Sequence, residues 1–117
     1  MVDGQALGGA AHGIGNALFE RMEFDQDGQP MTTTLAEYLL VTAPEMPQID
    51  LLHLESPSPL NPLGVKGVGE CGVVPAPAAI VSAIEDALSP FSVHVVRAPI
   101  SPPEIVALIE SARTQAD

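Results

Sequence analysis

Proline limits the folding of this chain more than any other residue does. The 117 residues include 12 prolines, and each fixes its own φ angle and removes a backbone N–H donor. The densest stretch, SPSPLNPLGVKGVGECGVVPAP at residues 56–77, predicts a long loop, and such loops in compact domains are usually functional or disordered. Aromatic residues make up only 3% of the chain, so Ala, Val, Leu and Ile have to form the core. These features predict one small domain with many irregular segments.

The charge balance argues against several classes of partner. Fifteen acidic residues stand against four basic ones, for a formal net charge of −11. Nucleic-acid binding needs Lys and Arg to neutralise phosphates, and anionic membranes attract the same residues, so we expect neither partner. The N-terminus lacks the pattern of a signal peptide, and the single cysteine, Cys71, cannot form an internal disulfide. We expect a cytoplasmic protein.

Three helices are predicted from the spacing of apolar and small residues. They cover residues 5–22, 78–88 and 101–113. The first is rich in Gly and Ala, so it is intrinsically weak and needs packing against the rest of the protein to persist. The last begins at an N-cap, Ser101, with Glu104 three residues later, which is the arrangement of a capping box. The last helix therefore has a local signal for its start, whereas the first depends on packing.

Strand signals lie between these helices. Asp27-Gly28 separates two runs able to extend, which is typical of a β-hairpin. Residues 49–56 and 91–96 predict strands, and residues 33–43 fit either a strand or a short helix. The order of elements shows no regular alternation of strand and helix. We therefore predict an α+β fold, with helices packed on a small mixed sheet that includes the hairpin.

The first glycine cluster, GGAAHGIGNALFE at residues 8–20, superficially matches a dinucleotide-binding turn. That turn needs a buried strand before it and an acid about 20 residues later at the end of a second strand. Too few residues precede Gly9 for such a strand, and Asp25 and Asp27 lie in the predicted hairpin. No lysine follows Tyr38 at the fourth position, as it does in short-chain dehydrogenases. Close helix packing explains these glycines better, and the three histidines are too widely spaced to predict a zinc site.

The second glycine cluster, GVKGVGECG at residues 64–72, has a different character. Four glycines surround Glu70, so the backbone can turn sharply and approach a ligand closely. A carboxylate on a tight, poorly solvated loop suits a general base, because desolvation favours its protonated form. The alternative is a loop acid that pairs with Lys66, the sole lysine, or with water.

Several motifs in register resemble one known family. SPSPLNPLGVKGVGE, followed by a proline-broken turn and an alanine-rich helix, is similar to the C-terminal part of the large subunit of molybdenum hydroxylases. This is the family of xanthine dehydrogenase, aldehyde oxidase and aerobic carbon monoxide dehydrogenase. VDGQALGGAAHGIGNALFE resembles that family's Gly-Gln-x-x-Gly-Gly helix, and FDQDGQPMTTTLAEYLLVTA its hairpin and the segment that follows. The resemblance runs from about Val2 to Ala107.

This resemblance implies roles for particular residues. Glu70 matches the catalytic glutamate, which takes a proton from the hydroxyl bound to molybdenum, and Gln5 matches a glutamine that hydrogen-bonds the molybdopterin. The resemblance implies no protein ligand to the metal, because the pterin dithiolene holds molybdenum. The wall that presents Glu70 is implied to consist of Lys66, Gly67, Val68 and Gly69.

The resemblance also implies that residues 1–117 are one domain, a C-terminal fragment of the large subunit. Most of the cofactor contacts and the substrate pocket then lie elsewhere, so the chain alone is expected to be inert and not to retain the molybdenum–molybdopterin cofactor. The implied partners are the remainder of the large subunit or companion chains, with iron–sulfur and flavin subunits. Alone, the chain is expected to self-associate as a dimer through residues 5–22 and 78–88. The alternative is an acidic interaction module, or a truncated remnant, without catalysis. Purines, aldehydes, N-heterocycles and carbon monoxide remain open as substrates.

Overall fold

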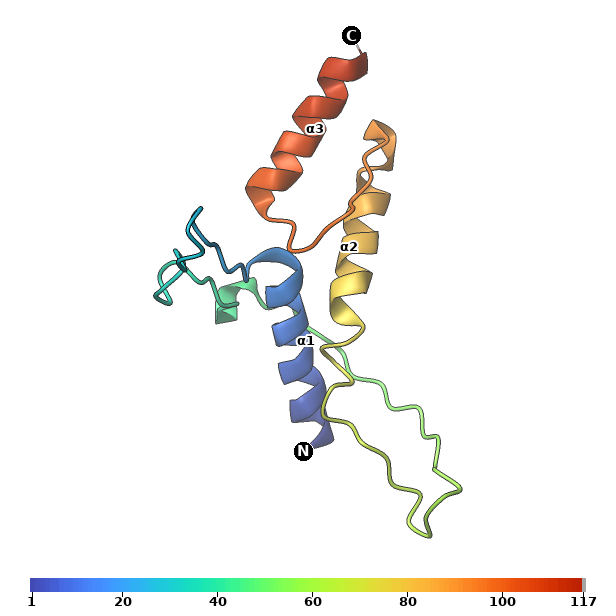
Figure 1. Cartoon of the computed structure of the whole chain (residues 1–117). Helices are drawn as coiled ribbons and strands as arrows, with labels where there is room; N and C mark the ends of the chain where they lie inside the picture. The colour runs from blue at the N-terminus through green and yellow to red at the C-terminus, as the bar shows by residue number, and fades with distance from the viewer. Residues whose placement is uncertain (117) are drawn as a thin grey trace.

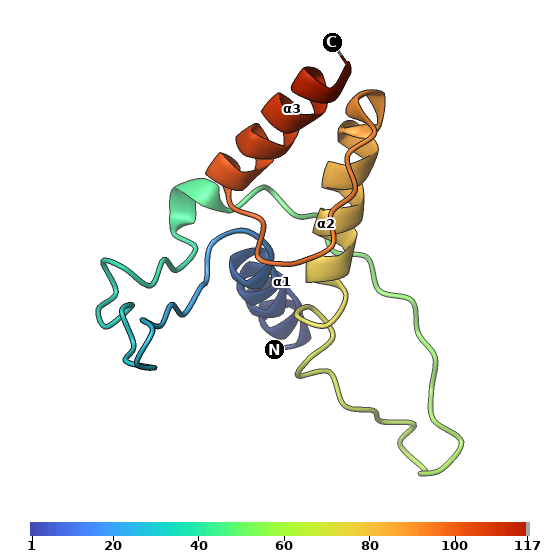
Figure 2. The same ribbon diagram turned by 45° about the horizontal axis from the view of Figure 1, so that its top comes forward.

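A computed structural model describes residues 1–116 and shows three main helices joined by long irregular segments (Figure 1). Helices α1 and α2 pack against each other, and α3 is joined to α2 by an extended stretch. The segment between η1 and α2 runs out as a long arm, away from the helices in both views (Figure 2). The elements are α1 (Val2–Leu18), η1 (Ala43–Glu45), α2 (Ala76–Ala87), η2 (Ser89–Phe91) and α3 (Pro102–Ala116).

The predicted α+β class is wrong. Within residues 1–116 there is no β-strand, and the pairing is limited to one isolated antiparallel bridge between Phe24 and Pro30. The tight turn between them does form, because Gly28 takes a φ of +80° and the Asp25 carboxylate accepts N–H bonds from Asp27 and Gln29. The runs on either side do not continue pairing, so the hairpin is a turn without strands.

The other two predicted strands, 49–56 and 91–96, are not strands either. Alternating apolar residues favour an extended backbone, but a strand also needs a neighbour that supplies hydrogen bonds along its edge. The described part of this chain supplies no such neighbour. The small mixed sheet is therefore absent, and the fold is helical.

The three predicted helices are confirmed, with shifted boundaries. Helix α1 begins earlier and ends sooner than expected, at Leu18, where the N–H groups of Phe19 and Glu20 both bond to the Gly15 carbonyl. The start of α3 follows the predicted cap, since the Glu104 carboxylate accepts bonds from the backbone N–H and the hydroxyl of Ser101, both at 2.9 Å. Local capping signals were thus sufficient to locate the last helix.

The core of the described chain is small. Its buried apolar side chains are Ala17, Leu88, Val93 and Ile100, and the Ile100 N–H donates to the Ala17 carbonyl at 2.7 Å. The accessible surface is 8759 Å², whereas a compact monomer of this mass exposes about 6,000 Å². The Cα radius of gyration is 18.2 Å, against about 13 Å for a compact domain of this length. The shape is that of an open piece, not of a closed globule.

Within residues 1–116, no helix is both long and apolar enough to cross a membrane.

Candidate functional site

Helix α1 and the segment that follows Glu70 meet through glycines. We call Gly9, Gly13 and Gly72 the glycine seam. A Cβ atom added to Gly9 would lie 2.9 Å from the Gly72 Cα, and one added to Gly13 would lie 2.5 Å from the Ala76 Cβ. A Cβ on Gly72 would overlap the Ala6 carbonyl oxygen. These distances leave no room for a side chain, so the prediction that the first glycine cluster serves helix packing is confirmed at Gly9 and Gly13, whereas an added Cβ at Gly8 would meet nothing within 4 Å.

The seam brings two predicted site residues into one neighbourhood. Gln5 immediately precedes Ala6 on the first turns of α1, and Glu70 lies two residues before Gly72. Glu70 is held in a turn, because its carbonyl accepts the N–H of Val74 at 3.2 Å. Both Gln5 and Glu70 are exposed. The fold therefore places a carboxylate and an amide side chain on segments that touch, with both open to a further group.

We call the residues from Lys66 to Glu70 the glycine wall, and those from Gly67 to Glu70 line an open depression. Val68, Cys71, Val74 and Pro75 contribute to it, and added Cβ atoms at Gly67 and Gly69 would meet nothing within 4 Å. Among the described residues, the five backbone N–H groups of the wall have no acceptor. Free amides beside open space are suited to oxygen atoms of a bound group.

Lys66 does not pair with Glu70. Its ammonium group donates to the Ser56 hydroxyl at 3.0 Å, which joins the two limbs of the long arm. Between these limbs, Asn61 bonds both the N–H and the carbonyl of Val65. The Glu70 carboxylate is exposed, so the poorly solvated environment expected for it is not supplied by the described residues.

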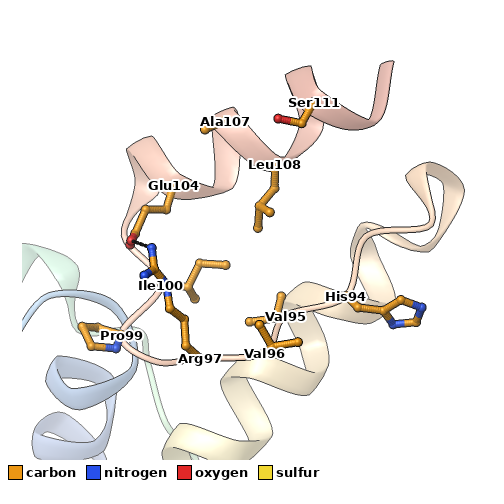
Figure 3. Close-up of a pocket in the computed structure, with 10 residues that line it drawn as sticks. All are labelled: His94, Val95, Val96, Arg97, Pro99, Ile100, Glu104, Ala107, Leu108 and Ser111. Carbon is orange, nitrogen blue, oxygen red and sulfur yellow. Dashed lines mark hydrogen bonds and ion pairs between the residues drawn. The ribbon is translucent and has the colours of Figure 1, made fainter. Parts of the chain in front are cut away.

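Another cavity, of about 220 Å³, lies beneath α3 and includes no predicted site residue (Figure 3). Its wall is largely apolar, and Arg97 donates to Glu104 at 2.8 Å at its edge. The backbone N–H and hydroxyl of Ser101, with Arg21 beside them, lower the pKa of Glu104 to about 2 from an ordinary 4.5. Every strong contact of Glu104 is already made within the chain, so we assign it to holding the start of α3 against the segments that bear Arg21 and Arg97.

No cluster of three or more metal-ligating side chains occurs in residues 1–116. His53 bonds Asp3 at 2.8 Å and His94 bonds Glu85 at 2.8 Å, so these two histidines lie in separate pairs. The first of these contacts joins the arm to the start of α1. No pattern in the sequence indicates this contact, because the two residues are distant in sequence and belong to no motif.

Known proteins resemble this chain over most of its length. Residues 1–47 match the family described as Molybdopterin cofactor-binding domain. The chain is 48% identical over 103 residues to the 6-hydroxypseudooxynicotine dehydrogenase complex subunit gamma of Paenarthrobacter nicotinovorans. This match covers 87% of this chain and 13% of that subunit. It is 41% identical over 106 residues to the nicotine 6-hydroxylase large subunit of the same organism, covering 91% of this chain and 13% of that subunit.

A solved structure supports the same assignment. The crystal structure of quinoline 2-oxidoreductase from Pseudomonas putida 86 matches 93% of this chain at a TM-score of 0.89 and 46% identity, over 14% of that chain. The chain belongs to the molybdenum hydroxylase family, that of the xanthine dehydrogenases, aldehyde oxidoreductases and carbon monoxide dehydrogenases, and corresponds to a fragment of its molybdopterin-binding large subunit. It spans about an eighth of the length of the relatives it matches.

Proposed function

We propose that this chain is the part of a molybdenum hydroxylase large subunit that presents the catalytic base, Glu70, beside the molybdopterin. The observation that carries the proposal is the glycine seam, because it holds Gly72, two residues after Glu70, against the helix that bears Gln5. The seam lies between the two residues that the family resemblance assigns to base and cofactor contact. The activity itself belongs to the assembled enzyme.

The chemistry of the glycine wall fits a molybdopterin. The unbonded N–H groups of Lys66–Glu70 can donate to oxygen atoms of the cofactor, and the space above Gly67 and Gly69 lets it approach the backbone. On the neighbouring helix, the exposed Gln5 amide offers one further donor and one acceptor. We propose that Gln5 and the wall hold the cofactor, and that no side chain of this segment ligates the metal.

When bound, the molybdenum cofactor supplies the oxygen nucleophile and accepts two electrons. Glu70 contributes a carboxylate that accepts a proton at an Oε atom as the nucleophile forms its bond to carbon. Desolvation by the rest of the subunit strengthens this base, because an ionised carboxylate is destabilised when water is removed. The wall holds Glu70 in place through its backbone, so the side chain needs no ion pair with Lys66.

The substrate class we propose is an aromatic N-heterocycle, hydroxylated at a ring carbon. The names of two of the relatives above, quinoline 2-oxidoreductase and nicotine 6-hydroxylase, refer to substrates of this type. Iron–sulfur and flavin subunits are the proposed partners that pass the electrons on, and the location is cytoplasmic. A comparison of turnover on quinoline-type rings, simple aldehydes, purines and carbon monoxide by the assembled enzyme tests this choice. A clear preference for one of the last three would contradict it.

The role of Glu70 is tested by Glu70→Gln in the assembled enzyme. We expect kcat to fall by roughly 10²- to 10⁴-fold, the range for loss of a general base, with molybdenum content unchanged by metal analysis. Glu110→Gln is the matched control, since it makes the same change at an exposed acid on α3, outside the proposed site, and it should retain turnover. Full turnover by Glu70→Gln would instead favour the non-catalytic interaction module.

The isolated chain is proposed to self-associate. Its surface exceeds that of a compact monomer of its mass, and several fully exposed leucines add to this. Light scattering at about 100 μM is the measurement, and a monodisperse monomer would contradict the proposal.

A further inference from the structure

The long arm carries a segment with two different apolar faces. In Ile49–Leu54, Ile49 and Leu51 are partly buried, and His53 reaches Asp3 on α1. The alternate residues Leu52 and Leu54 are 95% and 99% exposed. Side chains that alternate in this way lie on opposite sides of an extended backbone. One side of the segment is thus turned toward the helices, and the other presents Leu52 and Leu54 to the outside, with Asp50 at its start.

The backbone of the same segment is also unpaired. In the described structure, no N–H or carbonyl of residues 48–57 takes part in a backbone hydrogen bond. The segment belongs to the arm that runs out from the helices, and no other element lies along its outer side in either view (Figure 1, Figure 2). An extended segment with a free edge and an exposed apolar face has the properties of a strand that lacks its sheet.

The exposed surface and the length of a related chain indicate what covers this face. The accessible area of the whole chain exceeds that of a compact monomer of this mass by roughly 2,700 Å², so much of its surface is open to coverage. The quinoline 2-oxidoreductase structure matches 93% of this chain at a TM-score of 0.89, and the match is only 14% of that chain. The open shape therefore occurs within a much longer chain, which favours coverage by the same subunit over a second copy.

We propose that Ile49–Leu54 pairs as a β-strand with a strand from the rest of the large subunit, which buries Leu52 and Leu54 against an apolar face. The inference rests on the proposed function only in taking this chain as part of that subunit. The docked arm is held at its other side by the contact of His53 with Asp3, and it continues into the glycine wall. Docking then orders the limb that leads to Glu70.

Hydrogen exchange of the assembled large subunit, read by mass spectrometry on peptides covering residues 49–55, tests the docking. We expect these amides to exchange roughly 100-fold more slowly than in the isolated chain at low concentration, because strand pairing protects them. Fast exchange in the assembled subunit overturns the proposal. Protection in the isolated chain that rises with its concentration also overturns it, since a second copy would then be the partner.

A pair of variants separates docking from catalysis. Leu54→Asp should raise exchange at residues 49–55 in the assembled subunit at least tenfold, whereas Glu55→Gln, an exposed polar neighbour, should leave it unchanged. If Leu54→Asp prevents assembly, the wild-type exchange alone decides the question. Glu70→Gln should not alter this protection. If Glu70→Gln keeps full turnover while the amides of residues 49–55 are protected, the proposed base function has failed. If Glu70→Gln loses turnover while these amides exchange fast in the wild-type subunit, the proposed docking has failed.

Discussion

The two glycine-rich regions of this molecule differ in what surrounds them. In the glycine seam, a Cβ at Gly72 would lie 2.7 Å from the Ala10 nitrogen and 2.9 Å from the Gly9 carbonyl carbon. In the glycine wall, added Cβ atoms at Gly67 and Gly69 would meet nothing. The seam uses glycine to bring two backbones of the same chain together. The wall, a few residues away, leaves the same kind of backbone free to contact a bound group.

This difference shows that glycine content alone does not define a ligand site. The first cluster has the composition of a nucleotide-binding turn, but at Gly9 and Gly13 its space is filled by residues 72–77. The glycine wall keeps its N–H groups unbonded and its surface open. Unfilled space and unpaired donors together are the criteria that separate a binding backbone from a packing backbone.

One alanine substitution in each region tests the difference between the glycine seam and the glycine wall most strongly. Gly72→Ala should destabilise the contact with α1 by roughly 3 kcal/mol, because the methyl group meets backbone atoms that cannot rotate away. Gly67→Ala, the matched control, should change stability by less than about 0.5 kcal/mol. The measurement is hydrogen exchange of α1 in the assembled subunit, with an expected increase of roughly 100-fold for Gly72→Ala. Equal effects of the two variants would contradict the distinction.

A second variant tests the seam at Gly13, where an added Cβ would meet side-chain atoms of α2. Gly13→Ala places its Cβ 2.5 Å from the Ala76 Cβ and 3.2 Å from the Pro77 Cδ, so the start of α2 has to move. The strain is partly offset, because Ala is better than Gly in a helix by about 1 kcal/mol. We expect a net loss of about 1–2 kcal/mol, measured as faster exchange of both α1 and α2. A gain in stability would show that α2 shifts without cost.

The smallest effect is expected at the start of α3, which Glu104 holds by charge. The folded-state pKa of Glu104, about 2, lies below its ordinary value of 4.5. Its stabilising contribution is therefore present above about pH 4.5 and is lost as the pH falls toward 2. Glu104→Gln should cost about 1 kcal/mol at pH 7, since it weakens a helix cap.

Exchange of α3 in the variant, compared with wild type at each pH, measures this effect. The ratio should be about fivefold at pH 7 and should approach one near pH 2. Glu110→Gln on the same helix is the control, because Glu110 is exposed and makes no capping contact. A ratio that does not change with pH would assign the role of Glu104 to packing instead of charge.

Local signals in the sequence were enough to predict the helices but not the tertiary surroundings of the extended runs. Ser101 and Glu104 carry their cap within four residues, so the start of α3 could be predicted. Residues 49–56 have the alternation of a strand, yet the segment that would complete a ladder is not among the described residues. Local pattern specifies a conformation, whereas pairing depends on what lies beside it.

The candidate site shows the same division. Glu70 and Gln5 could be named from motifs, and the wall from its glycines, but their roles stay predictions. The seam that relates them could not be foreseen, because Gly72 reads as part of a flexible loop until its contact with Ala6 and Gly9 is seen. The contact between His53 and Asp3 likewise joins residues with no shared pattern.

The seam also works as a spacer of fixed length. Because Gly72 touches the α1 backbone with no intervening side chain, sliding α1 by one residue, about 1.5 Å, would move Gln5 relative to Glu70 by the same amount. Catalytic groups tolerate displacements of only about 0.5 Å. The absence of a side chain at Gly72 thus sets the spacing between the proposed base and the proposed cofactor contact, and we expect any larger group there to change this spacing without contacting either residue.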